Sequence, residues 1–188
     1  MRADLGVIIC VIFACACAGI AHAQAPAADQ EPAANQDQAA NPEQVTSKDR
    51  AALTQCLSNA KTTKSPAEGC IGVVQAPCLD APGGQSTYGM KDCANREAMV
   101  WDEQLNEAYK AALAAFGDSD ADGNGDKTIK GADLIRDMER AWLAFRSKKC
   151  AVASLQMAGG TGAGVLYNDC YLYETAHHAI WLNSLVAQ

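Results

Sequence analysis

One stretch constrains the fold more than any other: from Ser86 to Gly117, apolar side chains recur at helical spacing. Steps of three to five residues predict one apolar stripe on a continuous helix, formed by Met90, Cys93, Ala98, Trp101, Leu105, Ala108, Ala112 and Phe116. Ser86 or Thr87 can cap its first free amides, and Gly117 can adopt the left-handed conformation that ends a helix. About 30 residues make a helix of roughly 45 Å. Other segments must therefore cover its stripe.

The N-terminus has the features of an export signal. A short charged start precedes an apolar run, Leu5 to Ile20, and then Ala21-His22-Ala23. The run is short for a membrane helix, and the small residues suit signal peptidase. We expect residues 1–23 to be a signal peptide that is cleaved after Ala23. Lipidation at Cys15 or Cys17 is the alternative, because the residues before Cys15 loosely resemble a lipobox.

Six cysteines remain once the signal is removed: Cys56, Cys70, Cys78, Cys93, Cys150 and Cys170. An even number in an exported chain predicts three disulfides rather than metal ligands or reactive thiols, and a location in a bacterial periplasm or outside the cell. Chain proximity ranks Cys56–Cys70, Cys78–Cys93 and Cys150–Cys170 first. Other pairings stay open, because proximity only ranks them.

Composition separates a tail from a folded body. Residues 24–46 are almost entirely Ala, Gln, Asn, Pro, Asp and Glu, which predicts a disordered acidic linker. The net charge of the chain is −7, and its acids concentrate in this segment and in Asp118–Asp126. The rest of residues 47–188, apart from that acidic loop, is close to neutral, and the body is long enough for one domain with a core.

Helical periodicity continues on both sides of the central stretch. Further helices are expected over Ser47–Ala60, Pro66–Leu79, Lys130–Val152 and Val165–Val186, with no convincing strand alternation. The fourth helix is expected to bury Leu134, Met138, Ala141, Trp142 and Phe145, and the last one Tyr167, Tyr171, His178, Trp181, Leu182 and Leu185. The expected fold is all-α: a disulfide-stapled helical bundle, with two short helices followed by three longer ones.

Asp118 to Asp126 nearly matches a calcium loop of the EF-hand kind. Asp118, Asp120, Asp122, Gly123 and Asp126 occupy the expected positions, but position twelve is Ile129 instead of the bidentate Glu that calcium needs. A solvated acidic turn is favoured, and weak calcium binding is the alternative.

The remaining motifs give little support to an enzyme. The run Gly159–Gly164 lacks the Lys-Ser/Thr of a phosphate loop, and no hydrolase motif is present. His177 and His178 are adjacent, so they point about 100° apart on a helix and cannot share a metal. We therefore expect no catalytic residue, no metal, no cofactor and no nucleic-acid partner.

A polar ridge runs beside the apolar stripe. Asp102 and Asn106 are four residues apart and Tyr109 follows three later, so all three share one side of the helix. We expect a structural network in which Asp102 pairs with Arg146 inside the bundle, while Asn106 and Tyr109 bond the backbone or side chains of neighbouring helices. Three other acids of this helix are expected to be solvated: Glu97, Glu103 and Glu107.

These residues resemble the LprI-type lysozyme inhibitor family, a group of small exported helical proteins. The resemblance covers about residues 50–185 and rests on Cys70-Ile-Gly, Cys78, Thr87, Met90, Cys93, Trp101-Asp102, Leu105-Asn106, Tyr109, Arg140-Ala-Trp142, Phe145-Arg146, Cys150, Gly159-Gly160, Cys170 and Thr175. Glu139, Ser147 and His178 depart from the usual Gln, Asp and Arg. The resemblance implies binding and inhibition of lysozyme in the cell envelope, without naming an inhibitory motif. The alternative is a periplasmic structural or adaptor module without lysozyme activity, with weak calcium binding by the acidic loop as a further possibility. Because animal lysozymes are basic, the acidic loop can steer association with them.

Overall fold

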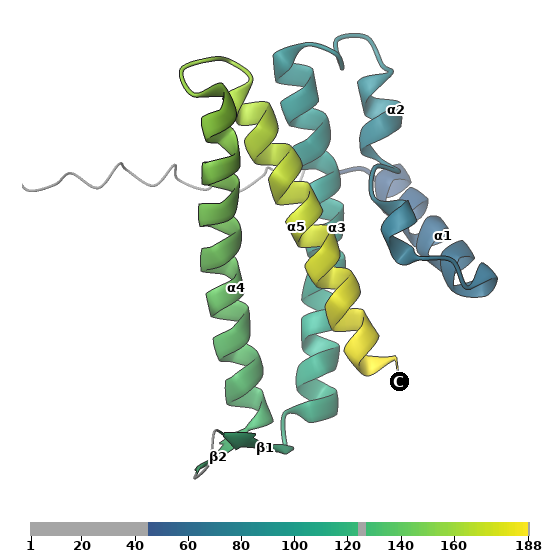
Figure 1. Cartoon of the computed structure of the whole chain (residues 1–188). Helices are drawn as coiled ribbons and strands as arrows, with labels where there is room; N and C mark the ends of the chain where they lie inside the picture. The colour runs from purple at the N-terminus through teal and green to yellow at the C-terminus, as the bar shows by residue number, and fades with distance from the viewer. Residues whose placement is uncertain (1–44, 124–126, 188) are drawn as a thin grey trace, which may run out of the picture. The chain divides into compact units, whose positions relative to one another are not determined.

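The computed structural model describes residues 45–123 and 127–187, and these are mainly helical (Figure 1). Its helices are α1 (Ser47–Thr63), η2 (Ala67–Cys70), α2 (Gln75–Leu79), α3 (Thr87–Phe116), α4 (Gly131–Ser154), η3 (Leu155–Met157) and α5 (Ala163–Val186). The prediction of an all-α, disulfide-stapled bundle is confirmed. The predicted signal peptide and nearly all of the predicted linker lie outside the described residues.

The core forms mainly where α5 packs along α3, the two helices in closest association (Figure 1). Trp101 of α3 is fully buried, and small side chains on both helices let the backbones approach closely. The other members of the buried cluster come from the segment before α1 and from α1, η2, α3 and α5: Val45, Leu53, Cys70, Ala98, Val100, Leu105, Ala108, Ala112, Leu172, Ala176, Ala179 and Leu182. The central stretch is therefore the helix that the others cover, as its stripe predicted.

The ends of α3 differ in how well the sequence predicted them. The Ser86 hydroxyl accepts a hydrogen bond from the Gly89 amide at 3.0 Å, as a capping residue should. Gly117, in contrast, is right-handed (φ −59°), so the expected left-handed stop is wrong. The chain leaves α3 through a turn in which the Ser119 amide donates to the Phe116 carbonyl at 3.0 Å.

The predicted helix Pro66–Leu79 is two short pieces, η2 and α2, rather than one helix. Gly72 lies between them with φ +103°, a conformation that side chains with a Cβ rarely adopt. The amides freed by this break are bound by Glu97 of α3, as described below. A glycine in the left-handed region and a buried acceptor therefore replace a continuous helix.

The buried face of α4 is rotated from the predicted one. Leu134 and Phe145 are 45% and 56% exposed, and Ala141 is exposed as well. The residues that face α5 or the core include Glu139, Arg146 and Cys150, together with Ile135, Met138 and Trp142. Apolar character therefore predicted only part of this face: Met138 and Trp142 pack against the core, but the face also includes two charged residues that have partners there.

A small hairpin joins α3 to α4, where an acidic turn was expected. Strands β1 (Asp120–Gly123) and β2 (Lys127–Lys130) pair antiparallel, with Asp120 opposite Lys130. The Asp120 carboxylate lies 2.5 Å from the Lys130 ammonium, and this contact raises the pKa of Lys130. The calcium prediction extends to Asp126, which lies outside the described residues.

Within the part of the chain that the structure describes, three disulfides connect neighbouring segments: Cys56–Cys70, Cys78–Cys93 and Cys150–Cys170. Their Cα–Cα distances are 5.7, 5.6 and 5.4 Å, within the usual range. This is the pairing that chain proximity ranked first. The first disulfide ties α1 to η2, the second ties α2 to α3, and the third ties α4 to α5.

Candidate functional site

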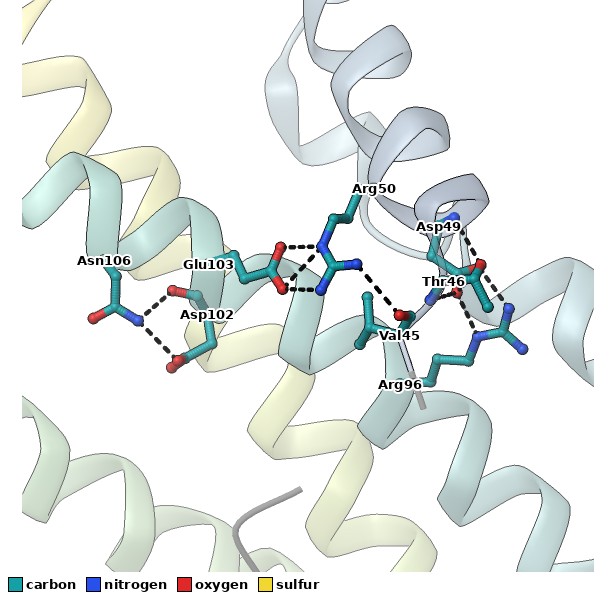
Figure 2. Close-up of polar contacts among 8 residues, drawn as sticks. All are labelled: Val45, Thr46, Asp49, Arg50, Arg96, Asp102, Glu103 and Asn106. Carbon is teal, nitrogen blue, oxygen red and sulfur yellow. Dashed lines mark hydrogen bonds and ion pairs between the residues drawn. The ribbon is translucent and has the colours of Figure 1, made fainter. Parts of the chain in front are cut away.

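Polar contacts attach the start of α1 to the middle of α3 (Figure 2). Thr46 caps α1 and, with Asp49, forms a capping box in which each side chain bonds the other residue's amide. Arg96 of α3 donates two hydrogen bonds to the Asp49 carboxylate, from Nε at 2.8 Å and from Nη2 at 2.7 Å. Val45 beside them is buried in the core. Val45 and Thr46, the last residues of the predicted linker, thus belong to the folded body.

Environment lowers the pKa of Asp49. Burial is the largest single influence and raises the pKa, but hydrogen bonds from the Thr46 amide and hydroxyl, together with the Arg96 guanidinium, outweigh it. The ionised carboxylate therefore stabilises the fold. Arg50 makes a second, more exposed link, because its Nε and Nη2 donate to Glu103 at 2.7 and 2.6 Å (Figure 2).

This gives a prediction of pH dependence. Asp49→Asn should lower the free energy of unfolding by about 1–2 kcal/mol at pH 7, as expected for a lost cap with a partly buried partner. Because the folded-state pKa lies below the ordinary value of 3.8, the wild-type advantage is complete above that value and disappears as the pH falls through the folded-state pKa. Urea unfolding of both proteins from pH 7 to pH 2.5 measures the difference. A difference that stays constant over this range would contradict the prediction.

Glu97 is fully buried, so its prediction as a solvated helix charge is wrong. Its Oε1 accepts hydrogen bonds from the Gly72 amide at 2.6 Å and from Trp101 Nε1 at 3.0 Å. Its Oε2 accepts from the amides of Val74 and Gln75 at 2.8 and 2.6 Å. Four donors thus satisfy one buried carboxylate, which fixes the loop between η2 and α2 against α3.

A signal for this role was present in the sequence. Cys93, Glu97, Trp101 and Leu105 follow one another at steps of four, which places Glu97 on the buried stripe. The charge of Glu97, in contrast, predicts an exposed side chain. The backbone amides that donate hydrogen bonds to this carboxylate are free because the helix is interrupted between η2 and α2, and periodicity does not reveal that interruption.

The structure brings together part of the polar network predicted around Asp102. Asp102 Oδ1 lies 3.9 Å from Arg146 Nη1, at the outer limit of an ion pair, and the Asp102 side chain is nearly half exposed. Asn106 donates to Asp102 itself, at 2.9 Å to the carboxylate and 2.8 Å to the backbone carbonyl (Figure 2). Tyr109 packs against the hydrophobic core.

Arg146 has stronger partners elsewhere. Nη1 donates to Thr175 Oγ1 at 2.9 Å, and the guanidinium lies over the rings of Trp142 and Tyr171 at 4.5 and 4.0 Å. Among the described residues, its buried Nε has no hydrogen-bond partner. Aromatic faces and one hydroxyl therefore hold this cation inside the bundle more closely than the carboxylate does.

The geometry sharpens the expectation for Asp102. Asp102→Ala should lower the free energy of unfolding by about 1 kcal/mol, because a long, half-exposed pair contributes little while its buried partner loses its nearest carboxylate. Arg146→Ala should cost more, roughly 3 kcal/mol, through lost ring contacts and the cavity that forms. Denaturant titration of both variants measures the two effects. The reverse order would contradict this assignment of partners.

Beside Arg146, two of the departures from the family pattern contact each other. His178 Nε2 lies 2.8 Å from Glu139 Oε2, and both side chains are largely buried. The His178 ring stacks on Trp142 with centroids 3.9 Å apart. Unlike His178, the adjacent His177 is exposed on α5. The two histidines thus lie in different environments, as their angular separation implied.

Other site classes find no support in the described part of the chain. Residues 45–123 and 127–187 contain no group of three side chains placed to hold a metal ion. Over the same residues, no helix combines the length and apolar character needed to cross a membrane. A shallow groove of about 400 Å³ lies beside the Cys56–Cys70 disulfide, between α1 and η2.

Comparison with known proteins finds a family match over much of this helical body. The family model described as lysozyme inhibitor LprI matches residues 78–182, more than half of the chain, from α2 to the last turns of α5. An uncharacterized protein of Rhizobium meliloti (strain 1021) is 26% identical over 114 residues, 60% of this chain and 82% of the relative. No solved structure matches. The chain thus belongs to the LprI family of lysozyme inhibitors.

Proposed function

We propose that this protein is exported to the bacterial cell envelope, where it binds lysozyme and protects peptidoglycan from hydrolysis. The observation that carries the proposal is the family match, which spans α3, α4 and α5 and therefore most of the packed body. The protein acts by binding rather than by catalysis. Its role resides in the surface that it presents to another macromolecule.

Disulfides and charge support this proposal. Two of the three bridges, Cys78–Cys93 and Cys150–Cys170, lie within the matched region and require an oxidising compartment to form. A helical body tied in this way has little conformational freedom to lose on binding, which favours affinity. The net charge of −7 attracts basic lysozymes and accelerates encounter at low salt.

The test is inhibition of cell-wall lysis. Purified residues 24–188 are titrated into a turbidity assay with several lysozymes, including a basic animal enzyme, at low and high salt. Inhibition at micromolar concentrations is expected, and it should weaken as salt rises if charge steers encounter. The reduced and alkylated protein serves as the matched control and should lose inhibition with its fold. Absence of inhibition by the oxidised protein at these concentrations overturns the proposal.

Export has a separate test. The intact mass of the protein recovered from the envelope fraction distinguishes the two processing routes. Cleavage after Ala23 gives the unmodified mass of residues 24–188, whereas lipidation at Cys15 or Cys17 gives a longer chain carrying acyl groups. Recovery of the full-length, unprocessed chain would contradict both processing routes.

A further inference from the structure

An aromatic ridge follows the outer side of α5. We define it by Tyr173, His177 and Trp181, which lie four residues apart and therefore line up on one face of the helix. Tyr173 is 50% exposed and Trp181 44% exposed, and His177 between them is also exposed. Large aromatic side chains in such a row suit a binding surface better than a solvated helix face.

The ridge is free of competing charge. The other exposed positions inside α5 are Asn183 and Ser184, both uncharged. The two carboxylates of this helix are engaged at its sides: Asp169 accepts from Gln75 at 2.8 Å, and Glu174 pairs with Lys149 at 2.6 Å. Depletion of charge with enrichment in Tyr and Trp is typical of the centre of a protein interface.

The exposed stripe of α4 differs in this respect. Leu134, Phe145 and Val152 are exposed there too, but exposed charged residues are interspersed with them: Arg136, Asp137, Arg140, Lys148 and Lys149. Desolvating that face would strip water from these charges, which costs free energy. The α4 stripe therefore provides a matched control of similar apolar character.

The rings of the ridge are supported from below and from the side. Trp181 stacks on the buried His178 with centroids 5.4 Å apart, and His178 in turn stacks on Trp142. Tyr173 and His177 stack on each other with centroids 6.5 Å apart. Side chains that are already held in place lose less entropy on binding, so the ridge is prepared to act as an anchor.

The shape of the ridge selects its partner. A helix face is convex and fits a groove in another protein, whereas sites for small ligands and sugars are concave. A lysozyme has such a groove, which accommodates the sugar rings of a glycan beside two catalytic carboxyl groups. One of these carboxyl groups lies in an apolar pocket, and the other is ionised. The aromatic rings of the ridge suit the apolar pocket, and the imidazole N–H between them suits the ionised carboxylate.

We propose that the Tyr173–His177–Trp181 ridge enters the substrate cleft of a lysozyme, where Tyr173 and Trp181 occupy the places of sugar rings and His177 donates to a catalytic carboxylate. This inference rests on the proposed function and names the inhibitory surface for it. It makes inhibition competitive with substrate, because the inhibitor and the glycan use one cleft.

The test compares variants of the ridge with the α4 control in the lysis assay. Tyr173→Ala and Trp181→Ala should each weaken inhibition about tenfold or more, as expected for interface anchors. His177→Ala should weaken inhibition as well, and His177→Gln, which keeps an N–H donor, should recover part of it. Phe145→Ala should inhibit like the wild type. Far-UV circular dichroism and melting temperature identify any variant whose loss reflects unfolding, and Tyr173→Ala is expected to keep its fold because Tyr173 is 50% exposed.

A second measurement locates the binding site on the enzyme. Chitotriose, a soluble trimer of N-acetylglucosamine that occupies the cleft, should compete with the protein for lysozyme in calorimetric titrations. Full inhibition by the ridge variants, or binding indifferent to chitotriose, overturns the ridge proposal and leaves the proposed function intact. Absence of inhibition by the wild type overturns both. If the wild type pellets with purified peptidoglycan and the ridge variants lose only that property, the ridge binds glycan and the proposal is wrong.

Discussion

Glu97→Ala is expected to lower the free energy of unfolding by about 3–5 kcal/mol, a large fraction of the stability of a domain of this size. The substitution leaves the amides of Gly72, Val74 and Gln75 and the indole N–H of Trp101 without their acceptor. It also opens a cavity at a site with no solvent exposure. Guanidinium unfolding followed by circular dichroism measures the loss.

Two variants make this prediction specific to the buried carboxylate. Glu97→Gln should have an intermediate effect, because the amide keeps one accepting oxygen but turns an NH₂ group toward backbone donors. Glu103→Ala, six residues along the same helix, should have little effect, since its ion pair with Arg50 is exposed. Equal stability of the Glu97 and Glu103 alanine variants would show that the carboxylate does not hold the η2–α2 loop.

Removal of the Cys150–Cys170 disulfide is the second large effect. The Cys150→Ala/Cys170→Ala variant should lose about 3 kcal/mol, because the bridge joins residues 20 apart and restricts the unfolded chain. Cys150 is fully buried at the end of α4, so removal of its sulfur also loosens packing against α5. Thermal and guanidinium unfolding under non-reducing conditions measure the change.

The reduced wild type provides the comparison for this bridge. Reduction of the wild type should lower the free energy of unfolding by more than the double substitution does, since reduction also opens Cys56–Cys70 and Cys78–Cys93. An unchanged unfolding midpoint in the double variant would mean that helix packing alone fixes the α4–α5 pair.

The sequence predicted α3 well because its apolar residues keep helical spacing over many turns and because Ser86 caps the first turn. It predicted the buried face of α4 only in part, for a physical reason. Periodicity sorts residues by polarity, whereas Glu139 and Arg146 are buried against His178, Thr175 and aromatic rings. His178 and Thr175 come from another helix, 39 and 29 residues away along the chain, and a pattern within one helix cannot indicate them.

The site residues likewise divide into those that the sequence predicted and those that depend on contacts seen only in the folded chain. Chain proximity was sufficient to rank the cysteine pairs, because their partners lie close along the chain. The break at Gly72 could not be predicted without the φ angle of that residue. The exposed row on α5 could not be predicted without knowing which side of α5 is covered by α3. Trp181 was assigned to the buried face for that reason, although the structure leaves it 44% exposed.

The contact between Glu97 and the loop before α2 has a consequence for the boundaries of the domain. The family match begins at residue 78, yet the carboxylate at the heart of α3 takes three of its four donors from residues 72–75. A chain shortened to residues 78–182 would leave the buried Glu97 carboxylate without these three hydrogen-bond donors. The cooperative unit of this protein is therefore larger than its region of family similarity, and the preceding segment and the bundle should melt together in a single transition.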